Sequence, residues 1–118
     1  MSKREPLLIL MDILDEINNI ELFVKDISSF DEFQNNTLVF YATIKALENI
    51  GEAVKNLPKS VKQKYDYSWK EIAGFRDIIA HEYFGVDKEI VWDVIQTELL
   101  ELRKAVYILI EQINKSQK

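Results

Sequence analysis

Apolar residues recur at three- and four-residue steps along nearly the whole chain, and few helix-breaking residues interrupt them. The sequence holds only three glycines and two prolines among its 118 residues. Such spacing places apolar side chains on one face of a helix, because an α-helix has about 3.6 residues per turn. The pattern therefore predicts an all-α chain: an up-and-down four-helix bundle with short connections and one extra short helix.

The first two long helices are placed by two prolines and by the apolar spacing. Pro6 suits the first turn of a helix that ends between residues 26 and 31. A second helix is expected from about Phe33 to Asn56, stopping before Pro58 because the residue before a proline disfavours helical geometry. The side chains expected inside are Leu7, Leu10, Leu14, Ile17 and Val24 of the first helix and Phe40, Ile44, Leu47, Ile50 and Val54 of the second.

The second half of the chain carries capping signals. After a short helical turn over residues 60–65, Ser68 and Glu71 form a capping box that predicts the start of a third long helix. Gly85 suits the end of that helix, and Asp87 suits the N-cap of the last one. The inward face of the last helix is predicted to carry Val91, Ile95, Leu99, Leu102, Val106, Leu109 and Ile113.

Length and composition limit the class of protein. The chain is predicted to form one domain over residues 1–118, because two separate cores would each approach the lower size limit. No apolar run reaches the ~18 residues that a membrane span needs. With no cysteine and no basic, apolar opening segment, we expect a cytoplasmic protein without membrane contact.

The net charge of −5 argues against a surface that attracts nucleic acid everywhere. A basic site must then be local. Lys55, Lys59, Lys62 and Lys64 cluster ahead of the third long helix. They form either a solvated lysine-rich turn or an edge that contacts RNA.

One short stretch concentrates polar chemistry on the third long helix. It reads "GFRDIIAHEYFG", residues 74–85, and contains the only histidine, His81. An ideal helix at about 100° per residue separates this region into a buried stripe, a far side and a flank. The stripe holds Ile72, Phe75, Ile78 and Ile79, the far side Gly74, Asp77 and His81, and the flank Arg76, Ala80 and Tyr83. His81 is therefore expected outside the core, facing solvent, a second chain or a ligand.

Two pairs in this stretch suggest chemistry. Asp77 and His81 are four residues apart, so the carboxylate can hydrogen-bond one imidazole nitrogen and raise the basicity of the other. Arg76 and Tyr83 share a face, which suits an anion such as phosphate. Each pair is equally compatible with an ordinary surface contact. We expect no metal and no cofactor, because the chain has one histidine, no cysteine and no phosphate-binding glycine loop.

Acid–base cleavage of RNA would need two copies of the stretch. Attack by the 2′-hydroxyl requires a base, an acid for the leaving 5′-oxygen and a cation for the charge on phosphorus. One chain offers one imidazole, and Arg76 and His81 lie about 140° apart on an ideal helix. Across a twofold axis, Arg76 of one protomer can approach His81 of the other. Gly74 and Ala80 leave room for that approach.

These residues carry a resemblance to a known family. "RDIIAH" is an Arg-x4-His motif, and "HEY" extends it to Arg-x4-His-x-Tyr. The sequence here resembles the HEPN superfamily and, within it, the HepT toxins of HepT/MntA toxin–antitoxin pairs. The segment "NIGEAV" at residues 49–54 and the spacing of Trp69, Ile72 and Arg76 are similar as well. The architecture is similar over nearly the whole chain, and the diagnostic part spans about residues 49–84.

The resemblance implies a metal-independent endoribonuclease toxin that acts on transfer or messenger RNA as a homodimer. Arg76 and His81 of both chains would line an interface cleft as catalytic residues, with Asp77 and Tyr83 supporting them. Tyr83 would be the residue that an MntA-like nucleotidyltransferase antitoxin modifies with AMP by O-adenylylation. The family often has Asn where this chain has Asp77.

Two other interpretations remain open from the sequence. A non-catalytic dimeric adaptor would use the same cleft to bind RNA or its nucleotidyltransferase partner. A bundle whose histidine is merely exposed would be a monomer.

Overall fold

The computed structural model describes residues 5–81 and 85–116, apart from the side chains of Ile78, Ala80, His81 and Ser116. All regular elements in these ranges are helical, which confirms the all-α prediction. In chain order they are α1 (Pro6–Val24), α2 (Phe30–Asn35), α3 (Thr37–Asn56), α4 (Lys59–Lys62), α5 (Trp69–His81), α6 (Lys88–Asp93), the π-helical segment η1 (Val94–Glu98) and α7 (Leu99–Ser116).

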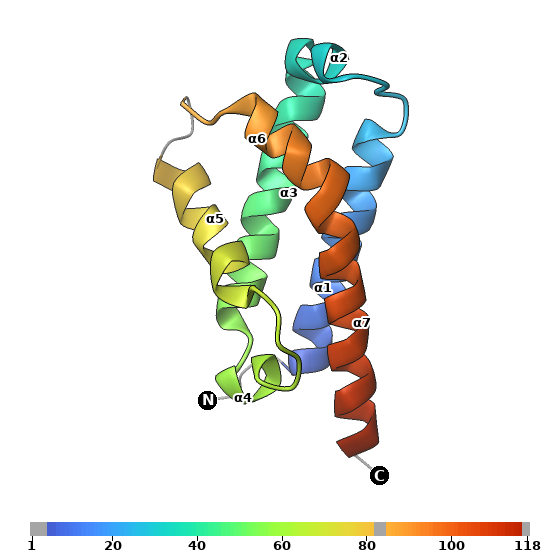
Figure 1. The fold of residues 1–118 in the computed structure, drawn as a ribbon, viewed down its shortest axis with the longest axis vertical. Coiled ribbons are helices and arrows are strands. Elements are labelled where there is room, and N and C mark those ends of the chain that lie inside the picture. Colours follow the sequence, from blue (N-terminus) through green and yellow to red (C-terminus); the bar gives the residue numbers. More distant parts are fainter. Residues whose placement is uncertain (1–4, 82–84, 117–118) are drawn as a thin grey trace.

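The long helices alternate in direction along the long axis of the molecule (Figure 1). α1 runs up, α3 down and α5 up, and α6, η1 and α7 follow one another without a break on the way down. α3 packs extensively against both α1 and α5, and α7 packs against α1. α3 is therefore the element that carries α5, on which the predicted site lies.

The buried face of α1 is rotated relative to the prediction. Leu10 and Ile17 are buried as expected, whereas Leu7, Leu14 and Val24 are only partly buried. The face that packs inward consists of Ile9, Leu10, Ile13, Ile17 and Ile20. The sequence left this choice open because residues 7–11 are all apolar and offer more than one stripe at helical spacing.

The second predicted helix is divided in the structure. Its five predicted inward side chains are buried, and it ends at Asn56, before Pro58, as expected. Its predicted start at Phe33 is wrong, because Phe33 belongs to the separate short helix α2. Asn36 ends α2 and caps α3, its side-chain oxygen accepting a hydrogen bond from Val39 N at 3.0 Å. The cap stops one helix and starts the next, since it satisfies a backbone N–H that has no helical partner.

The later elements follow the capping signals. The short turn expected over residues 60–65 is α4, which is shorter and begins at Lys59. α5 begins at Trp69, directly after Ser68, and Asp87 caps α6 by accepting from Glu89 N at 2.9 Å. Gly85 follows residues 82–84, which lie outside the described residues, so its role in ending α5 stays a prediction. The predicted inward face of the last helix is buried except for Ile113, which is partly buried.

Across the ranges given above, no helix has both the length and the apolar character that crossing a membrane requires.

Candidate active site

α5 lies very near α3 where Gly51 faces Arg76. A methyl group on Gly51 would overlap Cβ of Arg76 and would lie 3.2 Å from its Cα and from its backbone nitrogen. Neither helix can yield there without moving its backbone. Glycine at position 51 therefore allows the backbone of Arg76 to lie this near to α3. The glycine calls for such a packing reason, because a helix interior otherwise favours alanine by about 1 kcal/mol.

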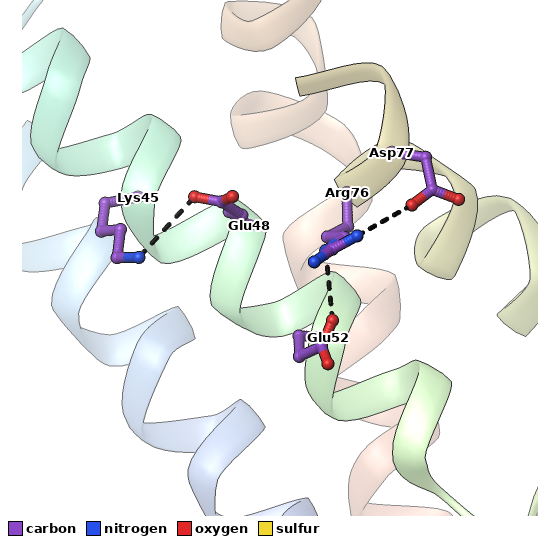
Figure 2. A network of polar contacts seen from close by, with 5 residues as sticks. All are labelled: Lys45, Glu48, Glu52, Arg76 and Asp77. Carbon is purple, nitrogen blue, oxygen red and sulfur yellow. Dashed lines mark hydrogen bonds and ion pairs between the residues drawn. The ribbon is translucent and has the colours of Figure 1, made fainter. Parts of the chain in front are cut away.

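The guanidinium of Arg76 is held by two carboxylates (Figure 2). Its Nε lies 3.1 Å from Oε2 of Glu52 on α3, and its Nη1 lies 3.1 Å from Oδ1 of Asp77 on α5. The Arg76 side chain is 33% exposed, so the guanidinium is accessible from solvent. The cluster has one positive and two negative charges, and a phosphate would have to compete with carboxylates for this cation.

The segment 49–54 of α3 connects this cluster to the rest of the molecule. Asn49 Nδ2 donates to Glu16 Oε2 of α1 at 2.7 Å, while Ile50 and Val54 are buried in the core. Gly51 and Glu52 face α5. One short stretch of α3 thus packs against α1, the core and Arg76 together.

Two of the predicted site residues fall where the structure gives no side-chain position. His81 is the last described residue of α5, and its side chain is not described. Tyr83 lies outside the described residues. The helix is continuous from Arg76 to His81, which keeps the two Cα positions on different sides of α5, about 140° apart by helical geometry.

The predicted far side of α5 is open where it is described. Asp77 is exposed, and a Cβ built on Gly74 would meet nothing within 4 Å. The predicted hydrogen bond between the Asp77 carboxylate and the imidazole of His81 involves a side chain outside the described residues and stays a prediction. The described contact of the Asp77 carboxylate is with Arg76. Arg76 lies at the flank, as predicted, with a partly exposed side chain.

The start of α5 is anchored to η1 by a tyrosine. The hydroxyl of Tyr67 donates to Oε1 of Glu98 at 2.6 Å, and burial together with that carboxylate raises the pKa of Tyr67 far above its usual range. The Tyr67 ring packs edge-on against Trp69, whose Nε1 donates to the carbonyl oxygen of Tyr65 at 3.1 Å. These contacts fix the first turn of the helix that carries Arg76.

Two grooves flank the helices that hold the cluster. An apolar groove of about 400 Å³ lies between α5 and the α6–η1–α7 helix, with Ile72, Phe75 and Val94 in its wall. A larger groove of about 950 Å³ lies between α1 and α3, and Glu52 lines it together with several acids of α1. Among the side chains that the structure describes, no three His, Cys, Asp or Glu residues are grouped as they would be around a metal ion.

A family match covers the elements that build this cluster. The model of the ribonuclease HepT-like family matches residues 13–109, a range that includes Glu52, Arg76, His81 and Tyr83. The chain belongs to the ribonuclease HepT-like family. The resemblance drawn from the Arg-x4-His-x-Tyr motif is thereby confirmed.

Several relatives of this HepT-like chain are similar over most of their length. "Putative RNase MJ0125" of Methanocaldococcus jannaschii is 41% identical over 116 residues, 98% of this chain and 99% of the relative. "Putative RNase TTE0752" of Caldanaerobacter subterraneus is 45% identical over 101 residues, 85% and 89% of the two chains. "Probable ribonuclease HepT" of Thermococcus cleftensis is 38% identical over 95 residues, 80% and 86% of the two chains. No solved structure matches.

The sequence offers a signal for the α3 side of this HepT-like site. Gly51 and Glu52, within the segment "NIGEAV", contact Arg76 from α3. A glycine in the middle of a strongly helical pattern indicates close packing of another element. The Tyr67–Glu98 hydrogen bond had no comparable signal, because it joins a loop to a helix far along the chain.

Proposed function

We propose that this HepT-like chain is a metal-independent endoribonuclease, the toxin of a toxin–antitoxin pair, which cleaves transfer or messenger RNA. The observation that carries the proposal is the family match across the whole Arg-x4-His-x-Tyr motif. An accessible guanidinium at Arg76 supports it, because a planar fork of N–H groups suits the oxygens of a phosphate.

The reaction follows from the groups that two chains offer. One His81 takes the proton of the ribose 2′-hydroxyl, and the 2′-oxygen attacks the adjacent phosphorus. The bond to the 5′-oxygen breaks, and that oxygen takes a proton from the second His81. Arg76 stabilises the negative charge that builds on the phosphoryl oxygens. The products are a 2′,3′-cyclic phosphate and a 5′-hydroxyl.

The proposed site is composite and forms where two protomers meet. Each chain has a single histidine, while the reaction needs a base and an acid. Arg76 and His81 stand on different sides of one helix, so a partner chain is better placed to complete the site than the same chain. The open side of α5 at Gly74 leaves room for a second copy of that helix.

Control by an MntA-like nucleotidyltransferase is part of the same proposal. The Tyr83 oxygen would attack the α-phosphorus of ATP, forming O-adenylyl-tyrosine and releasing pyrophosphate. The added AMP brings bulk and negative charge next to Arg76, where an RNA phosphate must bind. Adenylylation would therefore silence the toxin.

A second candidate function is a non-catalytic dimeric adaptor that binds RNA or the nucleotidyltransferase. The net charge of −5 and the two carboxylates on Arg76 favour it, because both weaken the attraction for RNA phosphates. An adaptor would bind RNA or the nucleotidyltransferase without cleaving RNA, and this binding would not require His81 to transfer a proton.

Mixed dimers test the composite ribonuclease. Wild-type and His81→Ala chains with different affinity tags are co-expressed, and heterodimers are isolated through both tags. The heterodimer retains one His81 and is expected to cleave RNA about a hundredfold or more slowly than the wild type, because the base and the acid come from different chains. Two independent sites, one in each chain, would instead leave about half of the wild-type rate.

The matched control pairs Arg103→Ala with the wild type. Arg103 is also held by a carboxylate, Glu21 at 2.7 Å, but it lies on α7. Both this mixed dimer and an Arg103→Ala homodimer should cleave like the wild type. A mixed wild-type and His81→Ala dimer that keeps about half of the wild-type cleavage would refute the composite site, and monomers in light scattering would refute it too.

A further inference from the structure

Arg76 is held by two carboxylates that differ in how firmly they are placed. Both side chains are about half exposed, 52% for Asp77 and 48% for Glu52, so the difference lies in the element and the nitrogen that each contacts. Asp77 is the next residue on the same helix and contacts the terminal nitrogen Nη1. Glu52 belongs to α3 and contacts Nε, the guanidinium nitrogen nearest the aliphatic stem. A contact at Nε restrains rotation of the whole guanidinium plane, whereas the terminal nitrogens are the ones best placed to reach outward.

The backbone beneath Glu52 is fixed relative to Arg76. Gly51 lies so close to Arg76 that no side-chain atom fits between them. Glu52 follows directly in the chain, so its Cα is held at a constant distance from α5. The neighbouring acid one turn earlier, Glu48, pairs instead with Lys45 of its own helix at 3.7 Å (Figure 2). Of these two acids on α3, Glu52 is the one directed at the predicted catalytic arginine.

We propose that Glu52 is a positioning residue of the ribonuclease site. It holds Arg76 through Nε, so that the terminal nitrogens face the RNA phosphate, and the phosphate displaces the carboxylate on a terminal nitrogen, that of Asp77. This inference rests on the proposed function for its catalytic consequence. The contact between Glu52 and Arg76 itself does not depend on RNA cleavage.

The first part of the test needs no activity. In ¹⁵N-labelled protein, the Nε–H signal of Arg76 is assigned by its absence from Arg76→Lys, and its exchange with water is measured. We expect Glu52→Ala to speed that exchange about tenfold or more, since a donor released from a carboxylate is open to solvent. Glu48→Ala is the matched control and should leave the signal unchanged. An unchanged signal in Glu52→Ala would overturn the proposal.

The second part separates positioning from binding and from folding. At saturating RNA, Glu52→Ala is expected to cleave about tenfold or more slowly, because a misplaced catalytic group loses rate. Its affinity for an uncleavable 2′-deoxy substrate should not weaken, since a negative charge has been removed. Glu52→Gln keeps an oxygen that accepts from Nε and should retain most of the rate. A purely structural role would lower the melting temperature and would not be rescued by Gln.

Arg76 itself provides the last control. In an Arg76→Lys background, which lacks Nε–H in that position, Glu52→Ala should lower the cleavage rate no further. Equal fractional losses in both backgrounds would overturn the proposal. If the wild type cleaves no RNA while the Arg76 signal still depends on Glu52, the ribonuclease function fails and Glu52 keeps its role of holding Arg76.

Discussion

Arg76 is surrounded by more negative than positive charge before any RNA is present. Glu52 and Asp77 each lie 3.1 Å from one of its nitrogens. Asp77 is half exposed and is adjacent in sequence, so it can turn to solvent at little cost. Glu52 is exposed to a similar degree but contacts Nε, whereas Asp77 contacts the terminal nitrogen Nη1. A phosphate that binds the terminal nitrogens therefore competes mainly with Asp77, and this acid is expected to weaken RNA binding.

Replacing Asp77 by Asn should strengthen RNA binding. We expect Asp77→Asn to bind an uncleavable 2′-deoxy RNA analogue about threefold to tenfold more tightly, as suits the removal of one nearby surface charge. Fluorescence anisotropy measures the change. Asp26→Asn, which removes an equal charge from the exposed loop after α1, should have a smaller effect. Weaker binding by Asp77→Asn would mean that the acid serves RNA binding, for example by orienting His81.

At the residue scale, sequence spacing located Arg76 and Asp77 on the correct sides of α5. It did not predict what they contact. The contact predicted between Asp77 and His81 stays a prediction, because the His81 side chain is outside the described residues. The contact of Asp77 with Arg76 was not predicted, because adjacent residues face different directions on a helix. Glu52 was missed because it lies on another helix, and periodicity within one helix carries no information about contacts between helices.

The close packing of α5 against α3 depends on the absence of a side chain at Gly51. Gly51→Ala should destabilise the fold by about 1–3 kcal/mol, because the added methyl group meets the backbone and Cβ of Arg76. Gly74→Ala is the matched control: it has open space and should gain up to about 1 kcal/mol from helix propensity. Urea unfolding followed by circular dichroism measures both. A Gly51→Ala protein as stable as Gly74→Ala would show that α5 does not lie this close to α3.

The anchor between the start of α5 and η1 should also be measurable. Tyr67→Phe removes a hydrogen bond to the Glu98 carboxylate and is expected to lower stability by about 1–2 kcal/mol. Tyr107→Phe, on the exposed face of α7, should change it little. The folded pKa of Tyr67 is raised above the unfolded value, so its contribution is full below about pH 10 and declines as the pH rises from there toward the folded pKa. Equal stability of Tyr67→Phe and wild type at pH 7 would refute the anchor.

At the element scale, caps and breakers predicted well where their chemistry is local. Pro58 and Asp87 did what their residue types favour. The π-helical segment was not predicted, since the steps of four between Val91, Ile95 and Leu99 suit an ordinary α-helix as well. The break at Asn36 was missed because apolar residues continue on both sides of it.

For the whole molecule, helical periodicity predicted the all-α class and the order of the long helices, because these follow from where apolar side chains are buried. Dimerisation stays a prediction. Large exposed apolar side chains are spread over several helices, among them Leu38 on α3, Ile90 on α6 and Leu100 on α7. None of these side chains by itself indicates an interface, and the His81 side chain lies outside the described residues.

For the whole protein, which is acidic, RNA cleavage tests the proposed function more directly than RNA binding does. The measurement is cleavage of transfer RNA and messenger RNA in EDTA by the purified wild type beside His81→Ala, with intact-mass analysis of both for bound AMP. We expect 2′,3′-cyclic phosphate products from the unmodified wild type and none from the folded variant. No cleavage by an unmodified, dimeric wild type, or equal cleavage by His81→Ala, would contradict the account.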